Sequence, residues 1–341
     1  MSTDALTPPE VRPQTPERHQ AVSRHGAIRE LLAELRYAAA ARYYLWSGIF
    51  GALVGLMATL SLNDISRRLV SDFLGALTDA QAQGIDVGAA LASAAGVETL
   101  ETGVTTIDNP LRYDFDRAWN AVGMLTGPGY AANALQFSAL IIVPIVAVAA
   151  GILLSVKDYR HRTIQLRAIR SSLPSIHASM VLTAASVAIA VAVASVLGAL
   201  VTGAVSRDAT LAGLESEFLA HSEATITFAD AGLFLLLAAV TALLFAVIGV
   251  ALGLVTRSMV VPMAVFTAVH LAVPMLGAWD PRRMVATLFS TTQRFEGTID
   301  VRVPDQASLA GAVFWLGVIC VVAWVAGLVA LRLRPRLGAG G

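Results

Sequence analysis

Two histidines are the ionisable side chains that the apolar parts of this sequence could use for chemistry. His270 lies within an apolar run, and His177 lies at the edge of another. Catalysis or proton relay inside such a run needs ionisable groups at depth, whereas a lone histidine commonly bonds to a neighbouring helix. Paired carboxylates, zinc-type His/Cys spacing and a nucleophile with its base cannot be assembled at one depth. The sequence therefore predicts no catalytic or metal-binding residue and argues against an enzyme.

A nucleotide-binding motif is also missing. The loop G-x-x-x-x-G-K-[ST] needs a lysine that directly follows a glycine, so that its ammonium group reaches the phosphates. Lys157 is the single lysine, and the residues L-L-S-V precede it. The chain therefore has no ATPase motif, and we expect no cofactor in it. If ATP and Mg²⁺ drive this protein, a separate polypeptide binds them.

The composition indicates a protein that spans a membrane. Of the 341 residues, 56% are hydrophobic and 14% are charged, whereas soluble domains carry about a quarter charged residues. Six uncharged runs reach the roughly 20 residues with which a helix crosses the hydrocarbon core. They are 43–62, 134–156, 177–202, 231–255, 259–277 and 309–331. We predict an all-α integral membrane protein with six transmembrane helices. The net charge of +0 gives no indication of nucleic acid binding.

The charges between these runs predict the orientation of the chain. Basic residues concentrate on the cytoplasmic side of membrane proteins. If both termini share a side with loops 157–176 and 256–258, that side holds 15 of the 24 basic residues and 6 of the 24 acidic ones. We therefore expect a multi-pass protein of the plasma (inner) membrane with both termini in the cytoplasm.

The N-terminal region divides into two predicted segments. Residues 1–22 hold four prolines among polar residues, which is typical of a disordered cytoplasmic tail. Residues 23–42 hold four apolar side chains at helical spacing, Ile28, Leu31, Leu32 and Leu35. Charged residues lie between them. This pattern predicts an amphipathic helix in the cytoplasmic interface, leading into a transmembrane domain over 43–331.

Two long connections are predicted on the outward side. The segment 63–133 is too long for a hairpin and too polar to span the membrane, so we expect small external helices there. In the connection 278–308, apolar and polar residues alternate as in a short amphipathic helix. Residues 332–341 form a predicted cytoplasmic tail with three arginines at its start.

Two glycine pairs have the spacing of helix-packing motifs. Gly51 and Gly55 lie in the first run, and Gly249 and Gly253 lie in the fourth. Small residues four apart let helix backbones approach closely in lipid. The pairs predict either ordinary packing within the chain or contact with another chain, and the spacing alone does not choose between these.

Three segments form a pattern that is known from one transporter family. The first is Glu34-Leu35-Arg36 before the first run, the second is Asp158-Tyr159-Arg160-His161-Arg162-Thr163-Ile164 with Pro174, and the third is Gly249, Gly253, Arg257 and Ser258. This layout resembles the permease subunit of a type-2 ATP-binding cassette (ABC) transporter in its actinobacterial form. In that family the second segment reads E-Y-x-x-G-T-I. Here Asp158 replaces the glutamate, and Arg162 replaces the glycine.

The resemblance implies an exporter of an amphipathic, lipid-like, drug or peptide substrate. Two permeases, identical or paralogous, would pair in the lipid membrane above two ABC ATPase subunits. A cytoplasmic coupling helix would contact the ATPase, with an apolar face of Ile164, Ile169 and Leu173. The implied coupling residues are Asp158, Tyr159, Arg162, Thr163, Ile164, Arg167, Ile169, Arg170, Leu173 and Pro174. The interfacial helix would add a second contact through Leu31, Glu34, Leu35 and Arg36.

Two alternatives remain open at the level of the sequence. The segment 157–174 could be a plain basic loop that anchors the topology on anionic lipid. The whole protein could be a membrane sensor or assembly scaffold, without transport activity, that binds a partner through 63–133.

Overall fold

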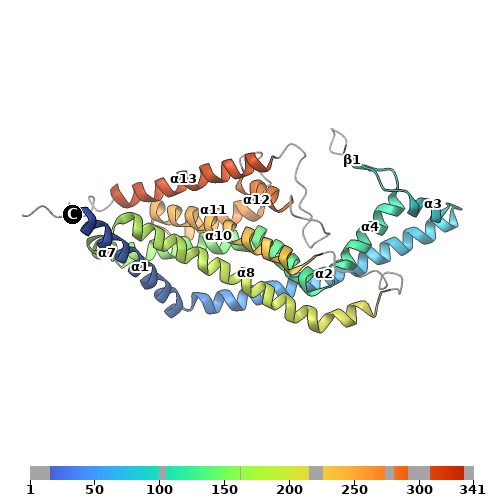
Figure 1. Ribbon diagram of the computed structural model, residues 1–341, viewed down its shortest axis with the longest axis horizontal. Helices are drawn as coiled ribbons and strands as arrows, with labels where there is room; N and C mark the ends of the chain where they lie inside the picture. The colour runs from blue at the N-terminus through green and yellow to red at the C-terminus, as the bar shows by residue number, and fades with distance from the viewer. Residues whose placement is uncertain are drawn as a thin grey trace, which may run out of the picture.

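The computed structural model describes residues 16–99, 105–161, 163–214, 226–272, 280–290 and 308–333. Within these ranges the chain is mainly helical, and its longest helices run along the long axis of the molecule (Figure 1). In chain order the elements are helices α1 (Pro16–Ala40), α2 (Tyr43–Ala82) and α3 (Val87–Ala92), strands β1 (Val97–Thr99) and β2 (Thr105–Ile107), helices α4 (Pro110–Gly123) and α5 (Gly127–Phe137), the π-helix η1 (Ser138–Ile142), and helices α6 (Val143–Arg160), α7 (Ile164–Arg170), α8 (Leu173–Leu211), α10 (Phe228–Thr256), α11 (Val260–Ala272), α12 (Pro281–Ser290) and α13 (Leu309–Leu333).

Five helical segments of the described chain are long and apolar enough to cross a membrane. They are Tyr43–Ala82, Gly127–Arg160, Leu173–Leu211, Phe228–Thr256 and Leu309–Leu333. Each covers most or all of one predicted apolar run, and α5, η1 and α6 together supply the second segment without a break. The structure therefore agrees with a helical, multi-pass membrane protein.

The predicted span 259–277 is not among these five. Its described part is α11, which has 13 residues. At 1.5 Å per residue such a helix is about 20 Å long, which is less than the hydrocarbon thickness of about 30 Å. Residues 273–279 lie outside the described ranges, so a total of six transmembrane helices stays a prediction.

Helix α2 is longer than the hydropathy pattern predicts. It begins at Tyr43, but it continues past Asn63 to Ala82 for 40 residues in all, so its second half occupies the start of the predicted outward segment 63–133. Polar residues end the apolar run here without ending the helix, and Asp64 pairs with Arg68 one turn on, at 2.5 Å. The helix ends just before Gly84, whose φ of 72° lies in the left-handed region.

The remaining described part of 63–133 holds α3, α4 and a small antiparallel hairpin. In that hairpin β1 pairs with β2, and Val97 lies opposite Ile107. The sequence predicts external helices here but not these two strands.

A second correction concerns residues 16–22, which the sequence assigns to a disordered tail. They form the start of α1, and proline is well suited to the first turn of a helix.

Side chains cap the starts of several helices. Asn109 accepts a hydrogen bond from a backbone N–H at the start of α4, and Ser172 does the same at α8. Thr227 and Asp230 form a reciprocal capping box at α10. Helices α4, α5 and α8 also have proline in their first turn, where its missing N–H removes no helical bond.

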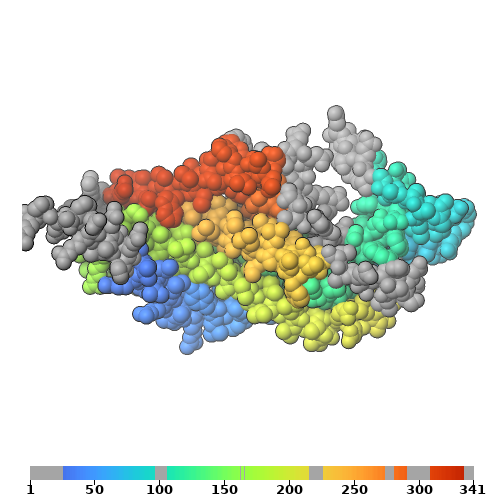
Figure 2. Space-filling view, viewed as in Figure 1, coloured from blue at the N-terminus to red at the C-terminus, as the bar shows by residue number. Residues whose placement is uncertain are grey.

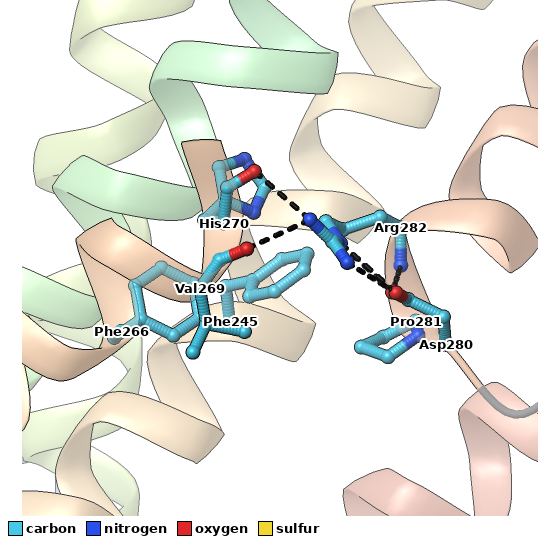
Figure 3. A pocket seen from close by; sticks show the side chains of 7 residues that line it. All are labelled: Phe245, Phe266, Val269, His270, Asp280, Pro281 and Arg282. Carbon is cyan, nitrogen blue, oxygen red and sulfur yellow. Dashed lines mark hydrogen bonds and ion pairs between the residues drawn. The ribbon is translucent and has the colours of Figure 1, made fainter. Parts of the chain in front are cut away.

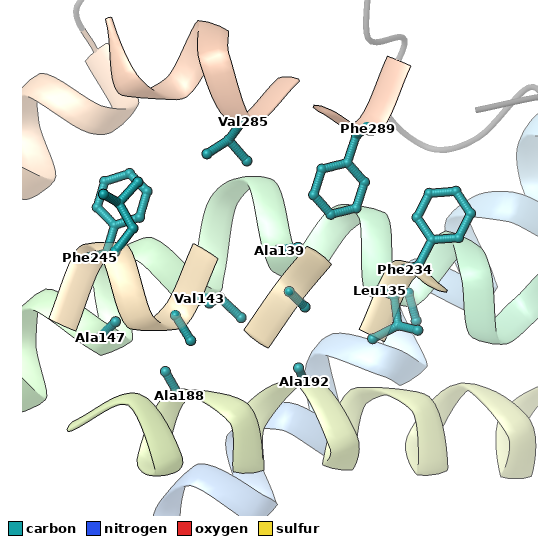
Figure 4. Close-up of a cluster of buried hydrophobic side chains, with 14 of the residues drawn as sticks. Leu135, Ala139, Val143, Ala147, Ala188, Ala192, Phe234, Phe245, Val285 and Phe289 are labelled. Carbon is teal, nitrogen blue, oxygen red and sulfur yellow. The ribbon is translucent and has the colours of Figure 1, made fainter. Parts of the chain in front are cut away.

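The core lies between the α5–η1–α6 segment, α8 and α10, with α12 packed over it (Figure 4). Small side chains such as Ala139, Ala188 and Ala192 are fully buried between these helices. Larger rings fill the wider space, and Phe234 of α10 stacks on Phe289 of α12 at 5.6 Å between ring centroids. This packing holds the central helices as one layered bundle.

The four predicted packing glycines all lie in helix contacts within the chain. Gly51 and Gly55 of α2 pack on the α8 backbone at Val191 and Ser195. In the second contact, Gly249 of α10 packs on the backbone of α6, and Gly253 lies against the backbone and one serine of α6. A Cβ at any of the four would overlap these atoms, so glycine is required for the close approach.

The described helices place α7 and the C-terminal end of α13 at one end of the molecule, with α1 beside α7 (Figure 1). Helices α3 and α4 and strand β1 lie at the other end, joined by the second half of α2. Helix α13 lies along one side of the bundle, at its surface (Figure 2). We call the end that holds α1, α7 and the C-terminal end of α13 the α7 end. We call the end that holds α3, α4 and β1 the α4 end.

Candidate functional site

The charged residues of the α7 end begin with an acidic face on α1. Glu30 and Glu34 lie one turn apart and point toward the bundle, and Glu34 is only 3% exposed. Ile28 and Leu32 are exposed instead. An amphipathic helix usually turns its charged residues toward water, and these two glutamates depart from that rule. They are buried because cationic partners from α6 and α7 compensate their charges.

Arg167 of α7 collects these acidic side chains. Its Nη2 donates to Glu30 at 2.9 Å, and its Nη1 contacts carboxylate oxygens of both Glu34 and Asp158. Its Nη2 also donates to the Ser179 hydroxyl of α8 at 3.3 Å. One guanidinium therefore joins four helices, α1, α6, α7 and α8. We call Glu30, Glu34, Lys157, Asp158 and Arg167 the charge cluster.

Lys157 is the second cation of the charge cluster. Its ammonium pairs with Glu34 at 2.5 Å and lies 3.5 Å from the centroid of the Tyr37 ring. The lysine is therefore held between a carboxylate and an aromatic face of α1. The single lysine of the chain thus joins α6 to α1.

The turn between α6 and α7 is fixed by Asp158. The Thr163 hydroxyl donates to Asp158 Oδ1 at 2.9 Å, and the Thr163 N–H donates to the Asp158 carbonyl at 3.0 Å. The other carboxylate oxygen contacts Arg167. These bonds give the Asp and Thr of the second sequence segment a physical role, because they direct the chain from α6 into α7.

Burial makes this arrangement dependent on all of its members. Arg167 is 15% exposed, and the Glu34 and Asp158 side chains are 3% and 5% exposed. Burial alone lowers the pKa of the Arg167 guanidinium, but the charges of Glu34, Asp158 and Glu30 outweigh it and raise that pKa above its ordinary value. Arg167 therefore stays charged, and removing it would leave three carboxylates with one cation.

Helix α7 presents a different face to the outside. Leu166 is 61% exposed and Ile169 is 83% exposed, and Arg170 lies beside them, also exposed. Ile164 and Leu173 instead pack against the core. The predicted apolar face of Ile164, Ile169 and Leu173 is therefore wrong. Ile164 and Ile169 are five residues apart, which places them about 140° from each other around a helix.

The other predicted coupling residues divide between α6 and α8. Tyr159 lies in the last turn of α6 with the centroid of its ring 5.3 Å from the Arg257 guanidinium, and Pro174 lies in the first turn of α8. Arg162 lies outside the described residues. On α1, Leu31 and Leu35 are half-buried and Arg36 is exposed.

Several members of this site could not be identified from the family pattern. Glu30, Lys157, Leu166, Ser171 and Ser179 carry no family motif, although Ser171 donates to Glu30 at 2.8 Å. The i, i+4 spacing of Glu30 and Glu34 was a usable signal, because two like charges on one helix face need partners.

His270, which lies within a predicted apolar run, is held by contacts with neighbouring residues (Figure 3). Its Nε2 donates to the Leu140 carbonyl of η1 at 3.2 Å, and its ring stacks on Phe266 at 5.4 Å between centroids. Arg282 pairs with Asp280 and donates to the carbonyl of Val269 at 2.8 Å at the end of α11. A cavity of about 250 Å³ lies between these groups. The histidine bonds to a neighbouring helix, as expected for a lone histidine.

The charge cluster at the α7 end connects four helices through one guanidinium. Within the described ranges, no group of three or more His, Cys, Asp or Glu side chains could hold a metal ion.

A scan against protein-family models and searches of curated proteins and solved structures found no match to the chain. The function must therefore be argued from the site itself.

Proposed function

We propose that this chain is the permease subunit of an ABC exporter and that α7 is its coupling helix. The observation that carries the proposal is the two-sided character of α7. Its outer face exposes Leu166 and Ile169, and its inner face is held through Arg167 on α1, α6 and α8. A partner that pushes on the outer face would therefore move three longer helices together.

The proposal extends to the surroundings of the site. Residues 259–277 supply a sixth span, both termini and α7 lie in the cytoplasm, and α1 lies in the interface beside α7. A separate ATPase binds ATP and Mg²⁺, and a second permease completes the transporter. The uncharged apolar runs of the bundle suit an amphipathic or lipid-like substrate better than an ion.

The test is a pull-down of the tagged, full-length chain from gently solubilised native membranes, with bound proteins identified by mass. We expect an ATPase with a Walker motif at about one copy per permease. The substitutions Leu166→Asp and Ile169→Asp should each abolish its retention, because a buried, unpaired carboxylate in an interface costs several kcal/mol. Ile85→Asp is the matched control, since Ile85 is 49% exposed at the α4 end.

Two results would contradict this reading at different levels. A folded wild-type chain that never retains an ATPase would rule out the transporter. Retention that is unchanged in both aspartate variants would keep the transporter and remove α7 as the docking element. Reversing the charge of Arg167 is not a suitable probe, because its burial means that the variant would also disturb the fold.

The second candidate is a membrane sensor or scaffold that binds a partner at the α4 end. The observation in its favour is that α4 packs on the second half of α2 through an aromatic cluster of Phe73, Phe115 and Trp119. This substructure extends from the bundle (Figures 1 and 2). In the same pull-down, a stoichiometric partner without a Walker motif would favour this candidate.

A further inference from the structure

A basic cavity lies on the side of α6 that faces α10. Val156, Tyr159 and Arg160 of α6, together with Arg257 and Met259 after α10, line an open space of about 470 Å³. We call it the basic pocket. It is distinct from the charge cluster, which uses Lys157 and Asp158 on the side of α6 that faces α1.

The two arginines of the basic pocket differ from the cations of the charge cluster. Arg160 and Arg257 are exposed, and within the described part of the chain neither forms an ion pair with a carboxylate. No acidic side chain is among the residues that line the pocket. Arg257 is held over the Tyr159 ring. The pocket therefore carries two guanidiniums whose charges are available to a ligand.

Arg257 is the C-terminal cap of α10. Its φ of 56° is the left-handed conformation in which many helices end, and its N–H donates to the Gly253 carbonyl at 2.9 Å. Both arginines also lie at C-terminal ends of helices, where a positive charge is favourable. That effect accounts for the charges but not for the open space between them.

The pocket opens beside a surface that suits lipid chains. Arg257 directly follows the apolar helix α10, and the neighbouring side chains of Val255, Val260 and Val261 are 47%, 75% and 62% exposed. Arginines that end an apolar span lie at the level of lipid headgroups. A ligand with a negative head and apolar chains would satisfy both surfaces at once.

We propose that the basic pocket binds the phosphate headgroup of an anionic phospholipid, whose acyl chains lie along the exposed valines of α11. Guanidiniums form paired hydrogen bonds with phosphate oxygens, and basic pockets between transmembrane helices bind such headgroups. The volume lies within the range of small-ligand sites, about 300–1,000 Å³. The proposal concerns the isolated chain and does not depend on an ATPase partner.

Native mass spectrometry of the purified full-length chain in mild detergent tests the proposal. The probes are phosphatidylglycerol, phosphatidylcholine and inorganic phosphate. We expect retention of one phosphatidylglycerol in preference to phosphatidylcholine. Arg160→Gln and Arg257→Gln should each weaken this binding about fivefold, because one arginine near anionic lipid contributes about a factor of five. The control is Arg332→Gln, an exposed arginine of α13 at the same end of the molecule, which should bind as the wild type does.

Three outcomes would overturn the proposal. Equal retention of the two lipids would show that the headgroup charge is not recognised. Wild-type binding in the Arg160→Gln and Arg257→Gln variants would place the lipid elsewhere. Displacement of the lipid by inorganic phosphate at matched concentration would show a small-anion site without a lipid. If Arg257→Gln fails to fold, Arg160→Gln decides the test, since Arg160 has ordinary backbone angles.

Discussion

The α7 end and the α4 end of the molecule use their charges differently. At the α7 end, Arg167 contacts Glu30 and Glu34, which lie more than 130 residues earlier in the chain. At the α4 end, the ion pairs Asp64–Arg68 and Arg112–Asp116 each stay within a single helix, at a spacing of four residues. The first pattern fixes helices relative to one another, and the second supports individual helices.

Burial separates the two ends further. The Asp64 and Arg68 side chains are 57% and 73% exposed, so solvent screens their pair and its contribution is a few tenths of a kcal/mol. The charge cluster is shielded from solvent, and its partners depend on one another. We infer that the α7 end is built to move as a unit, whereas the α4 end is held mainly by aromatic packing on α2.

The largest expected effect comes from breaking the charge cluster. Arg167→Met keeps the length of the side chain but leaves Glu30, Glu34 and Asp158 with Lys157 alone. We expect the free energy of unfolding in mild detergent to fall by about 4 kcal/mol, as for other buried pairs that lose one partner. Thermal unfolding followed by tryptophan fluorescence would measure the loss.

The matched control is Arg68→Met at the α4 end. Arg68 pairs with Asp64 at 2.5 Å on the same helix, and the two side chains are 73% and 57% exposed. We expect this change to cost under about 1 kcal/mol. Equal losses in the two variants would remove the distinction between the ends.

A smaller effect is expected where α2 and α8 connect the two ends. Gly55→Ala would place a Cβ against the Ser195 carbonyl of α8, and the backbones would have to separate. We expect a loss of about 2 kcal/mol, as for other overpacked contacts. Gly48→Ala on the same helix is the control, because no atom lies within 4 Å of the added carbon. A neutral Gly55→Ala would mean that α2 and α8 can separate without cost.

Hydropathy could predict the bundle because the membrane imposes one rule on every span. Five apolar runs coincide with long helices. The same rule explains the error at α2, since hydropathy reports where an apolar surface ends and not where a helix ends. Asn63 has a polar side chain, yet it remains helical and donates to Ser206 of α8 at 2.9 Å. A polar residue whose hydrogen bonds are satisfied can therefore lie inside a helix as well as in a loop.

The charge cluster could be predicted only in part, for a different reason. Glu34, Asp158 and Arg167 were identified as candidate residues from the family pattern, but their contact with one another joins positions up to 133 residues apart. No periodicity in the sequence reports such a pairing. The assignment of Ile164 and Ile169 to different faces of α7 could have been predicted, because the angle between them follows from helix geometry alone.

The smallest effect tests the α4 end by its pH dependence. Burial raises the pKa of the Asp114 carboxyl; the charge of Asp72 raises it further, against the opposing effect of Arg117. The native state then holds this proton more tightly than the unfolded state does. The contribution of Asp114 to stability is therefore fully present below its ordinary pKa of 3.8 and is lost as the pH rises through its native pKa.

Asp114→Asn should therefore raise the melting temperature near neutral pH, and the gain should shrink as the pH falls toward about 4. Asp116→Asn is the control of opposite sign, because it removes the partner of Arg112 and should lower the melting temperature slightly. A gain for Asp114→Asn that is independent of pH would assign the effect to packing. In that case the charge of Asp114 would be compensated in the native state. The two ends would then differ less in how their carboxylates are paired than we infer.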